Sequence, residues 1–152
     1  HLVGRNYAIV SGGALGIDTV SHEAALDAEG KTVVVLGGGL LRLYPRQNEN
    51  LFEEILQRGG ALISEYAPSM EPQKYTFPER NRIIAALSRV LVLSQAHDRS
   101  GSLSTARVAL DLGREIFVLK PLQEDENFAG SRKLIELGAR EFLKGEELSQ
   151  SL

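Results

Sequence analysis

The chain has 152 residues, of which 43% are hydrophobic and 24% charged, with a net charge of −3. This is enough apolar material for a folded core, and the absence of cysteine excludes disulfides and thiolate metal sites. The three histidines lack ligand spacing and no apolar run reaches the length of a membrane span, so we expect no metal, no membrane segment and a cytoplasmic location. The chain opens on His1 rather than Met, which indicates a truncated N-terminus.

The first half of the chain alternates short apolar runs with helical patterns. A strand is expected over Tyr7–Val10, followed by a helix that Asp18 would cap and Gly30 would end. The run "TVVVLGGG" is typical of a strand buried on both faces of a parallel sheet. A helix in "NENLFEEILQR" and a strand in "ALISEY" follow.

The second half repeats this alternation. We expect a helix in "ERNRIIAALS", a strand in "RVLVLSQA", a helix in "LSTARVALDLG", a strand in "EIFVLK" and a last helix in "SRKLIELG" after the polar segment "QEDENFAG". Regular alternation of this kind predicts an α/β fold: a doubly wound, mostly parallel sheet with helices on both faces. Nothing in the sequence indicates a second domain over residues 1–152.

Three loops rich in small residues follow expected strands: "SGGALGID", "GGGLLRLYPRQN" and "RSGSLST". In a parallel sheet, such loops meet at the carboxyl edge, where backbone amides at helix N-termini bind anions. A single glycine-rich turn serves close packing as often as binding, but three on one edge favour a ligand site. The first loop lacks the glycine spacing of a dinucleotide-binding turn, and no acidic residue ends the second strand to bind a ribose, which argues against a nicotinamide-dependent enzyme. No loop carries a Walker lysine, which argues against a P-loop ATPase.

Side-chain catalysis has weaker support. Asp18 and His22 are four residues apart on one helix face, where they could interact, although a helix cap plus a structural histidine explains them more simply. The serines of "SGSLST" lack the strand-elbow setting of an activated nucleophile.

The stretch "KYTFPERNR" interleaves basic and aromatic residues, which suits a single nucleic-acid strand whose phosphates meet cations and whose bases stack. Residues 73–114 carry seven Lys or Arg against three Asp or Glu, a net charge of +4 in an acidic protein. The simpler alternative makes Phe77 a core residue and pairs Arg80 or Arg82 with Glu65 or Glu79. We favour that alternative for Phe77, and a binding role for Lys74 and Arg82.

Taken in order, five segments resemble the DNA-processing protein A (DprA/Smf) family. They are "VSGGALGIDTVSHEAAL", "VVVLGGGLLRLYPRQNENL", "GALISEY", "FPERNRIIAALS" and "SGSLSTARVALDLGREIFVL", spanning about residues 8 to 119. The resemblance implies an extended Rossmann-like fold and a homodimer without catalytic activity or cofactor. It also implies that the protein binds single-stranded DNA, protects it and helps load the RecA recombinase in natural transformation.

Carried over by motif, the resemblance implies one DNA-binding pocket. Its expected residues are Ser11, Gly12, Gly13, Gly16, Lys74, Arg80, Asn81, Arg82, Ser100, Gly101 and Ser102.

The chain departs from the family pattern at several points. Leu15 stands where an arginine is usual, Arg132 stands where an asparagine is usual, and "KPLQEDEN" replaces a proline-glycine turn. From these motifs we expect residues 1–152 to lack the first strand of the fold, with its glycine-serine-arginine turn, and the winged-helix domain that many members carry.

The alternative is an enzyme that resembles phosphoribohydrolases of the same superfamily, which release a base from a nucleoside monophosphate. Those enzymes carry a glutamate two residues after a threonine. Aligned on Thr105, that position is Arg107. Replacing a carboxylate by a cation removes a proton-transfer group, which favours anion binding over glycosidic cleavage.

Overall fold

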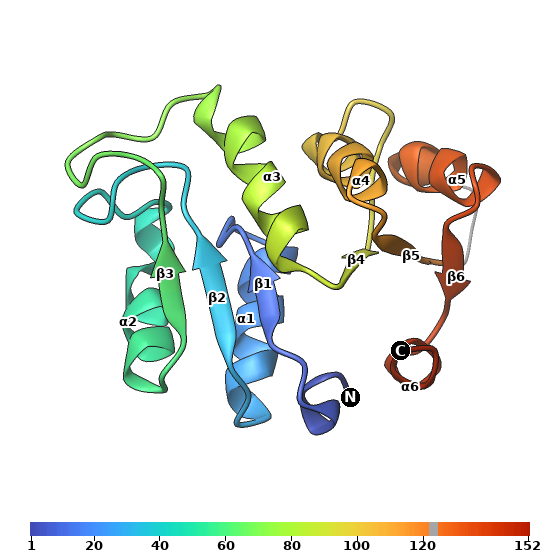
Figure 1. Cartoon of the computed structure of the whole chain (residues 1–152), viewed down its shortest axis with the longest axis horizontal. Coiled ribbons are helices and arrows are strands. Elements are labelled where there is room, and N and C mark those ends of the chain that lie inside the picture. Colours follow the sequence, from blue (N-terminus) through green and yellow to red (C-terminus); the bar gives the residue numbers. More distant parts are fainter. Residues whose placement is uncertain (122–124) are drawn as a thin grey trace. The chain divides into compact units, whose positions relative to one another are not determined.

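The computed structural model describes residues 1–121 and 125–152, which form two compact units, His1–Ile84 and Ala85–Leu152 (Figure 1). Each unit is a three-stranded parallel sheet with helices, so the predicted α/β class is confirmed. The strand orders, β1-β2-β3 and β4-β5-β6, are each that of one half of a doubly wound Rossmann-like fold. Because such folds are themselves built from two halves, the single domain over residues 1–152 stays a prediction.

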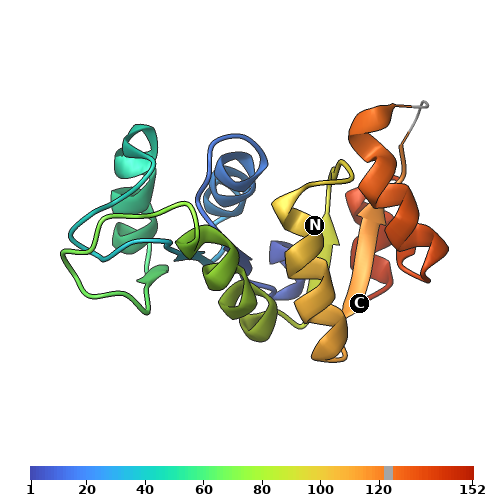
Figure 2. The same ribbon diagram turned by 90° about the horizontal axis from the view of Figure 1, so that it is seen from above.

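In the first unit, the strands pair in parallel, with Val10 opposite Val33 and Val34 opposite Leu62. Helices α1 and α2 cover one face of this sheet and α3 covers the other (Figure 2). The unit's elements are η1 (Val3–Arg5), β1 (Ile9–Ser11), α1 (Ile17–Asp27), β2 (Thr32–Val35), η2 (Arg46–Asn48), α2 (Glu49–Gln57), β3 (Ala61–Ile63) and α3 (Thr76–Leu87), whose last residues belong to the second unit.

The core of the first unit lies between β2 and helices α1 and α2. Val34, Phe52 and Ile55 are fully buried there, and Leu26 and Leu36 are nearly so. The unbroken apolar run of β2 is explained by its central place in the sheet, where both faces are covered. This packing fixes the carboxyl end of β2 beside the turn from β1 to α1, where the candidate site lies.

In the second unit, Val92 pairs with Phe117 and Val118 with Glu141, again in parallel. The elements are β4 (Val90–Leu93), α4 (Gly101–Asp111), β5 (Glu115–Leu119), η3 (Glu126–Phe128), α5 (Ala129–Glu136), β6 (Arg140–Phe142) and α6 (Gly145–Gln150).

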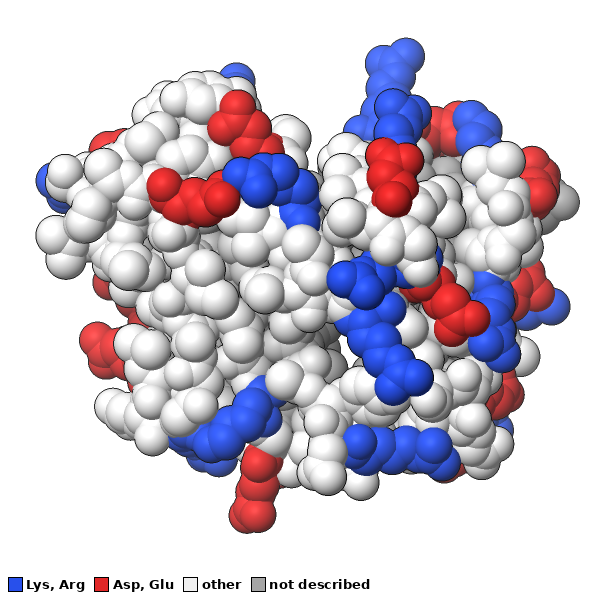
Figure 3. All heavy atoms as spheres, in the orientation of Figure 1, with Lys and Arg blue, Asp and Glu red and all other residues white. Residues whose placement is uncertain are grey.

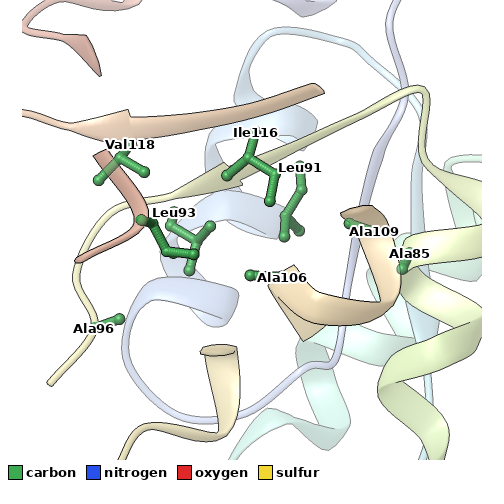
Figure 4. Close-up of a cluster of buried hydrophobic side chains, with 9 residues drawn as sticks. Ala85, Leu91, Leu93, Ala96, Ala106, Ala109, Ile116 and Val118 are labelled. Carbon is green, nitrogen blue, oxygen red and sulfur yellow. The ribbon is translucent and has the colours of Figure 1, made fainter. Parts of the chain in front are cut away.

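The core of the second unit joins its sheet to α4 by small and branched side chains. Ala106 and Ala109 of α4 lie in one buried cluster with Leu91 and Ile116, which project from the strands, and Val118 lies farther along the same cluster beside Leu93 (Figure 4). Alanine on the inner face lets the helix lie close to the sheet, so few large side chains are needed to fill the space.

The structure adds elements that the sequence pattern did not predict. β6 and α6 close the second unit, and β6 is only three residues long and bears Arg140 and Glu141. Helices α3 and α4 begin three and two residues before their expected starts. Part of the polar segment at 123–130 lies outside the described residues. Among residues 1–121 and 125–152, no helix has the length and apolar character needed to span a membrane.

Candidate functional site

The turn between β1 and α1 is held by a carboxylate from its own helix. Helix α1 begins at Ile17 with Gly16 as its N-cap, so the expectation that Asp18 caps the helix is wrong. Asp18 lies in the first turn, and its Oδ2 accepts hydrogen bonds from the amides of Gly12 (3.2 Å) and Ala14 (3.1 Å). The carboxylate thereby fixes the two amides on either side of Gly13.

Glycine is required at position 13 of this turn. Gly13 has a φ of +70°, and a Cβ there would lie 2.7 Å from Val34 and 2.8 Å from Phe52, two core side chains. Its carbonyl accepts a hydrogen bond from Nδ2 of Asn48 (2.9 Å), which also donates to Thr19 (2.8 Å). Asn48 is buried and joins the turn to the start of α2, a contact that the sequence pattern does not reveal.

Arg80 reaches the same turn from α3. Only 6% of it is exposed, and Nη1 donates to the carbonyl of Gly12 (2.7 Å) and to that of Val35 at the end of β2. Its Nε has no acceptor among the described residues, and no carboxylate there forms an ion pair with it. Burial lowers the pKa of Arg80 and the charge of Asp18 opposes that shift. A buried cation with one unmatched donor is the kind of group that an incoming anion stabilises.

A small open pocket of about 210 Å³ lies above this arginine. The rings of Tyr44 and Phe77 form part of its wall, with centroids 5.9 Å apart, and Tyr44 is about half exposed. The pocket is lined by Gly12, Ala14, Leu15, Tyr44, Pro45, Phe77 and Arg80. It therefore combines an apolar, aromatic wall with a buried positive charge beside a glycine turn.

The other expected basic residues differ in what they contact. Lys74 is exposed, just before α3, and makes no hydrogen bond or ion pair within the described residues. Arg82 forms an ion pair with Glu65 and donates a hydrogen bond to its carboxylate. This hydrogen bond and the negative charge of Glu65 raise the pKa of Arg82. That pair is the one the structural alternative predicted for Arg82. Asn81 is half-buried on α3 between the two arginines.

His22 is a buried residue with a structural role. It is fully buried, its Nδ1 lies 2.6 Å from Oγ1 of Thr32, and that hydroxyl donates to the carbonyl of Ile9 (2.8 Å). Because the single hydroxyl hydrogen goes to Ile9, Nδ1 of His22 is the donor, and Nε2 has no partner among the described residues. Burial lowers the pKa of His22 to about 4, with Asp18 opposing. The histidine therefore ties α1 to the sheet as a neutral ring.

The second glycine-rich loop has a packing role. Gly37, Gly38 and Gly39 are all buried, and Cβ atoms there would meet Phe77, Pro72 and the backbone of Ala67 and Pro68 respectively. These three glycines therefore serve packing, whereas Tyr44 and Pro45 of the same loop line the pocket above Arg80. The glycines let the segment after β3 lie directly on the end of β2.

The third loop belongs to the second unit and begins α4. Ser100 is the N-cap, and its Oγ accepts a hydrogen bond from the amide of Ser102 (3.2 Å). Gly101 is the first helical residue, and a Cβ there would meet nothing within 4 Å. This loop is an ordinary capped helix start whose glycine is not required by packing.

Charged side chains of both signs are interspersed over the face of the molecule shown in Figure 3. Several basic side chains of the protein pair with carboxylates, among them Arg42 with Glu71 (3.2 Å) and Lys133 with Asp98 (3.0 Å). Within residues 73–114, Arg82 pairs with Glu65, so the positive balance of that segment is not by itself a measure of unpaired cations. In the first unit, Lys74 and Arg80 are the expected basic residues that no carboxylate pairs with among the described residues.

Comparison with known proteins decides the family. The family model described as DNA recombination-mediator protein A matches residues 1–152. The chain belongs to this family. Among its relatives, Protein Smf of Escherichia coli strain K12 is 43% identical over 151 residues, which are 99% of this chain and 40% of that protein. The DNA processing protein DprA of Bacillus subtilis strain 168 is 40% identical over 148 residues, 97% of this chain and 50% of that protein.

Solved structures agree with this family. DNA processing protein A from Streptococcus pneumoniae superposes with a TM-score of 0.85 at 41% identity, over 93% of this chain and 50% of that one. The protein from Helicobacter pylori, whose structure concerns its single-stranded DNA binding mode, superposes with a TM-score of 0.88 at 36% identity, over 99% and 67%. The predicted Rossmann-like fold is thus confirmed. The chain spans 40% of the length of the Escherichia coli protein and 50% of the length of the Bacillus subtilis protein.

Of the expected residues, the structure brings Gly12, Gly13 and Arg80 together. Arg80 donates to the carbonyls of Gly12 and Val35, a Cβ at Gly13 would meet Val34, and Ser11 ends the neighbouring strand. Lys74 and Arg82 make no hydrogen bond to this turn within residues 1–121 and 125–152. The sequence pattern did not reveal that Asp18 accepts hydrogen bonds from the amides of the turn or that Asn48 donates one to its carbonyl. The contact of Asp18 could have been expected, because a carboxylate near the start of a helix that follows a glycine turn can accept hydrogen bonds from the amides of that turn.

Proposed function

We propose that this protein binds single-stranded DNA through phosphate contacts at the turn between β1 and α1 and at the start of α3. The observation that carries the proposal is Arg80: a buried cation that forms no ion pair with a carboxylate of the described residues, lining an open pocket beside a glycine turn. Membership of the recombination-mediator family and similarity to a protein studied for its single-stranded DNA binding mode support the same ligand.

Donors for a phosphate are available at this turn. The amides of Leu15, Gly16 and Ile17, at the start of α1, donate to no acceptor within residues 1–121 and 125–152. They add to the positive end of the helix dipole. Lys74 supplies an exposed charge that forms no ion pair with the residues that the structure describes. Asp18 already occupies the amides of Gly12 and Ala14, so we assign the phosphate to the later amides.

The remaining expected residues fit this proposal in different ways. Arg80 contributes its charge to a bound phosphate while its Nη1 stays bonded to two backbone carbonyls. Arg82 becomes a ligand when DNA replaces Glu65 as its partner. In the second unit, we propose that Ser100, Gly101 and Ser102 form a further phosphate-binding helix start. Asn81, together with Ser11, Gly12 and Gly13 at the end of β1, completes the set of residues proposed to contact DNA.

The apolar wall of the pocket is suited to a nucleobase. Base–aromatic stacking contributes about 1–3 kcal/mol per base and tolerates any sequence, because every base has a flat face. Tyr44, about half exposed at the rim, is placed for such a contact. The expected binding is therefore strong for single strands, weak for duplexes and nearly independent of sequence.

For the whole protein, we propose the role that the family resemblance implies. The protein protects single-stranded DNA entering the cell and helps to load the RecA recombinase on it, as a homodimer in the cytoplasm and without catalysing a reaction. Adding the protein to RecA on oligonucleotides coated with single-strand binding protein should accelerate RecA filament formation. Unchanged filament kinetics would contradict the loading role while leaving DNA binding intact.

Replacing Lys74 tests the DNA contact. Lys74→Gln should weaken binding of labelled oligo-dT and oligo-dA by the same factor, and reduce the slope of log K against log salt by about 0.7. The matched control is Lys31→Gln, which makes the same change of charge at the opposite end of β2, where Lys31 donates to the carbonyl of Arg58 (2.8 Å). Equal effects of the two variants would show that Lys74 makes no phosphate contact.

A further inference from the structure

The peptide units around Gly12 are held from two sides by oppositely charged side chains. The amide of Gly12 donates to Asp18 (3.2 Å), and its carbonyl accepts from Nη1 of Arg80 (2.7 Å). The amide of Ala14 donates to the same Asp18 oxygen (3.1 Å). The conformation of the turn is therefore set by a carboxylate on one side and a guanidinium on the other.

The position of Asp18 is unexpected for a site that binds a polyanion. A carboxylate beside a bound phosphate repels it, and hydrogen bonds to Asp18 remove two amides that a phosphate could otherwise use. If Asp18 served only as a helix-start acid, the N-terminal dipole would explain it, but its Oδ2 points back to residues four and six positions earlier. Its contacts are therefore with the turn.

We propose, building on the proposed function, that Asp18 is a positioning residue for the phosphate-binding turn. By holding the amides of Gly12 and Ala14, it leaves those of Leu15, Gly16 and Ile17 as the donors for phosphate. Arg80 holds the carbonyl of Gly12 from the other side, so the turn is ordered before DNA arrives. The favourable effect of this order on binding exceeds the repulsion between the Asp18 carboxylate and the phosphate.

Substitutions at Asp18 separate positioning from repulsion by the sign of their effects. Asp18→Ala removes both the charge and the acceptor, Asp18→Glu keeps the charge but moves the acceptor by one methylene, and Asp18→Asn keeps an acceptor oxygen without the charge. Positioning predicts weaker DNA binding for Ala and Glu, and binding at least as tight as wild type for Asn. Repulsion alone predicts tighter binding for Ala and Asn and no change for Glu.

The experiment measures binding of labelled oligo-dT to the full chain by fluorescence anisotropy at several salt concentrations. We expect Asp18→Ala to raise Kd about tenfold, the effect of losing hydrogen bonds to a charged acceptor, and Asp18→Glu to raise it severalfold. The salt slope should stay unchanged, because no phosphate contact is lost. Asp27 is exposed at the other end of α1, so Asp27→Ala and Asp27→Glu are the matched controls. Tighter binding by Asp18→Ala, or no change in Asp18→Glu, would overturn the proposal.

Amide hydrogen exchange tests the same proposal without DNA. In Asp18→Ala and Asp18→Glu, the amides of Gly12 and Ala14 should exchange about tenfold faster than in wild type, while amides in β2 keep their rates. Failure of wild-type protein to bind DNA would refute the proposed function and leave this measurement valid. Unchanged exchange at Gly12 and Ala14 would refute the positioning role even if DNA binds. Should Asp18→Ala not fold, Asp18→Glu carries both measurements.

Discussion

A single methyl group added at Gly12 should disturb both the fold and the DNA site. A Cβ on Gly12 would lie 2.6 Å from Nη2 and 2.5 Å from Cζ of Arg80, where an ordinary contact needs about 3.4 Å or more. The guanidinium is buried and bonded to two carbonyls, so it cannot swing aside freely. In Gly12→Ala it must move by about 1 Å, and both hydrogen bonds then lengthen or break.

The expected loss of stability follows from those two bonds. A hydrogen bond to a charged group contributes about 1.5–3 kcal/mol, and the freed carbonyls regain part of this from water, so we expect Gly12→Ala to lower the free energy of unfolding by roughly 2–4 kcal/mol. All four tyrosines lie between residues 7 and 75 and the chain has no tryptophan. Urea unfolding followed by tyrosine fluorescence therefore reports on the first unit.

The control for this variant is Gly4→Ala. A Cβ at Gly4 meets nothing within 4 Å, so that substitution should change stability by less than about 0.5 kcal/mol. Gly12→Ala should also weaken oligo-dT binding, because the turn loses the contact of Arg80. Wild-type stability in Gly12→Ala would show that the guanidinium moves at little cost, and that its bonds to Gly12 and Val35 contribute little.

Three further substitutions test separate parts of the account. Glu65→Gln removes the partner of Arg82 and should tighten oligo-dT binding about two- to threefold in anisotropy titrations; weaker binding would argue that the pair itself is needed. The pKa of His22 is lowered from 6.5 to about 4, so the unfolded state takes up its proton first as pH falls. The free energy of unfolding should therefore fall between pH 6.5 and 4 by about 3 kcal/mol at most. In His22→Gln, urea midpoints measured across this pH range should no longer show this fall. A pH profile of His22→Gln identical to that of wild type would assign the titration to another group. Ser100→Ala removes the cap of α4 and should cost about 1 kcal/mol in thermal unfolding followed by circular dichroism, whereas Ser104→Ala at the exposed next turn should cost less; equal losses would contradict the capping role.

The order of elements could be predicted because the central strands β2 and β5 are apolar and largely buried, and helical patterns alternate with the strands along the chain. The run Thr32–Val35 has no polar interruption, as a central strand requires. β6 escaped prediction for the opposite reason. It is a three-residue edge strand with Arg140 and Glu141 exposed, so neither its composition nor its alternation differs from a loop.

The site was predictable only in part. The glycine turn after β1 and the cation at Lys74 follow from residue type and from the rule that loops at the carboxyl edge bind ligands. The burial of Arg80 could not be predicted in this way, because an arginine on a helix is usually exposed. Only the fold places its guanidinium against the carbonyl of Gly12. The burial of Gly37–Gly39 depends on where the segment after β3 crosses, a long-range feature without a local signal.

The most direct test of the central claim is binding of a fluorescent oligo-dT to the wild-type chain over a range of salt concentrations, with a duplex of equal length as competitor. The proposed function predicts tight binding that weakens steeply as salt increases and that the duplex does not displace. Absence of binding at low salt, or equal displacement by the duplex, would contradict the assignment of the turn between β1 and α1 to single-stranded DNA.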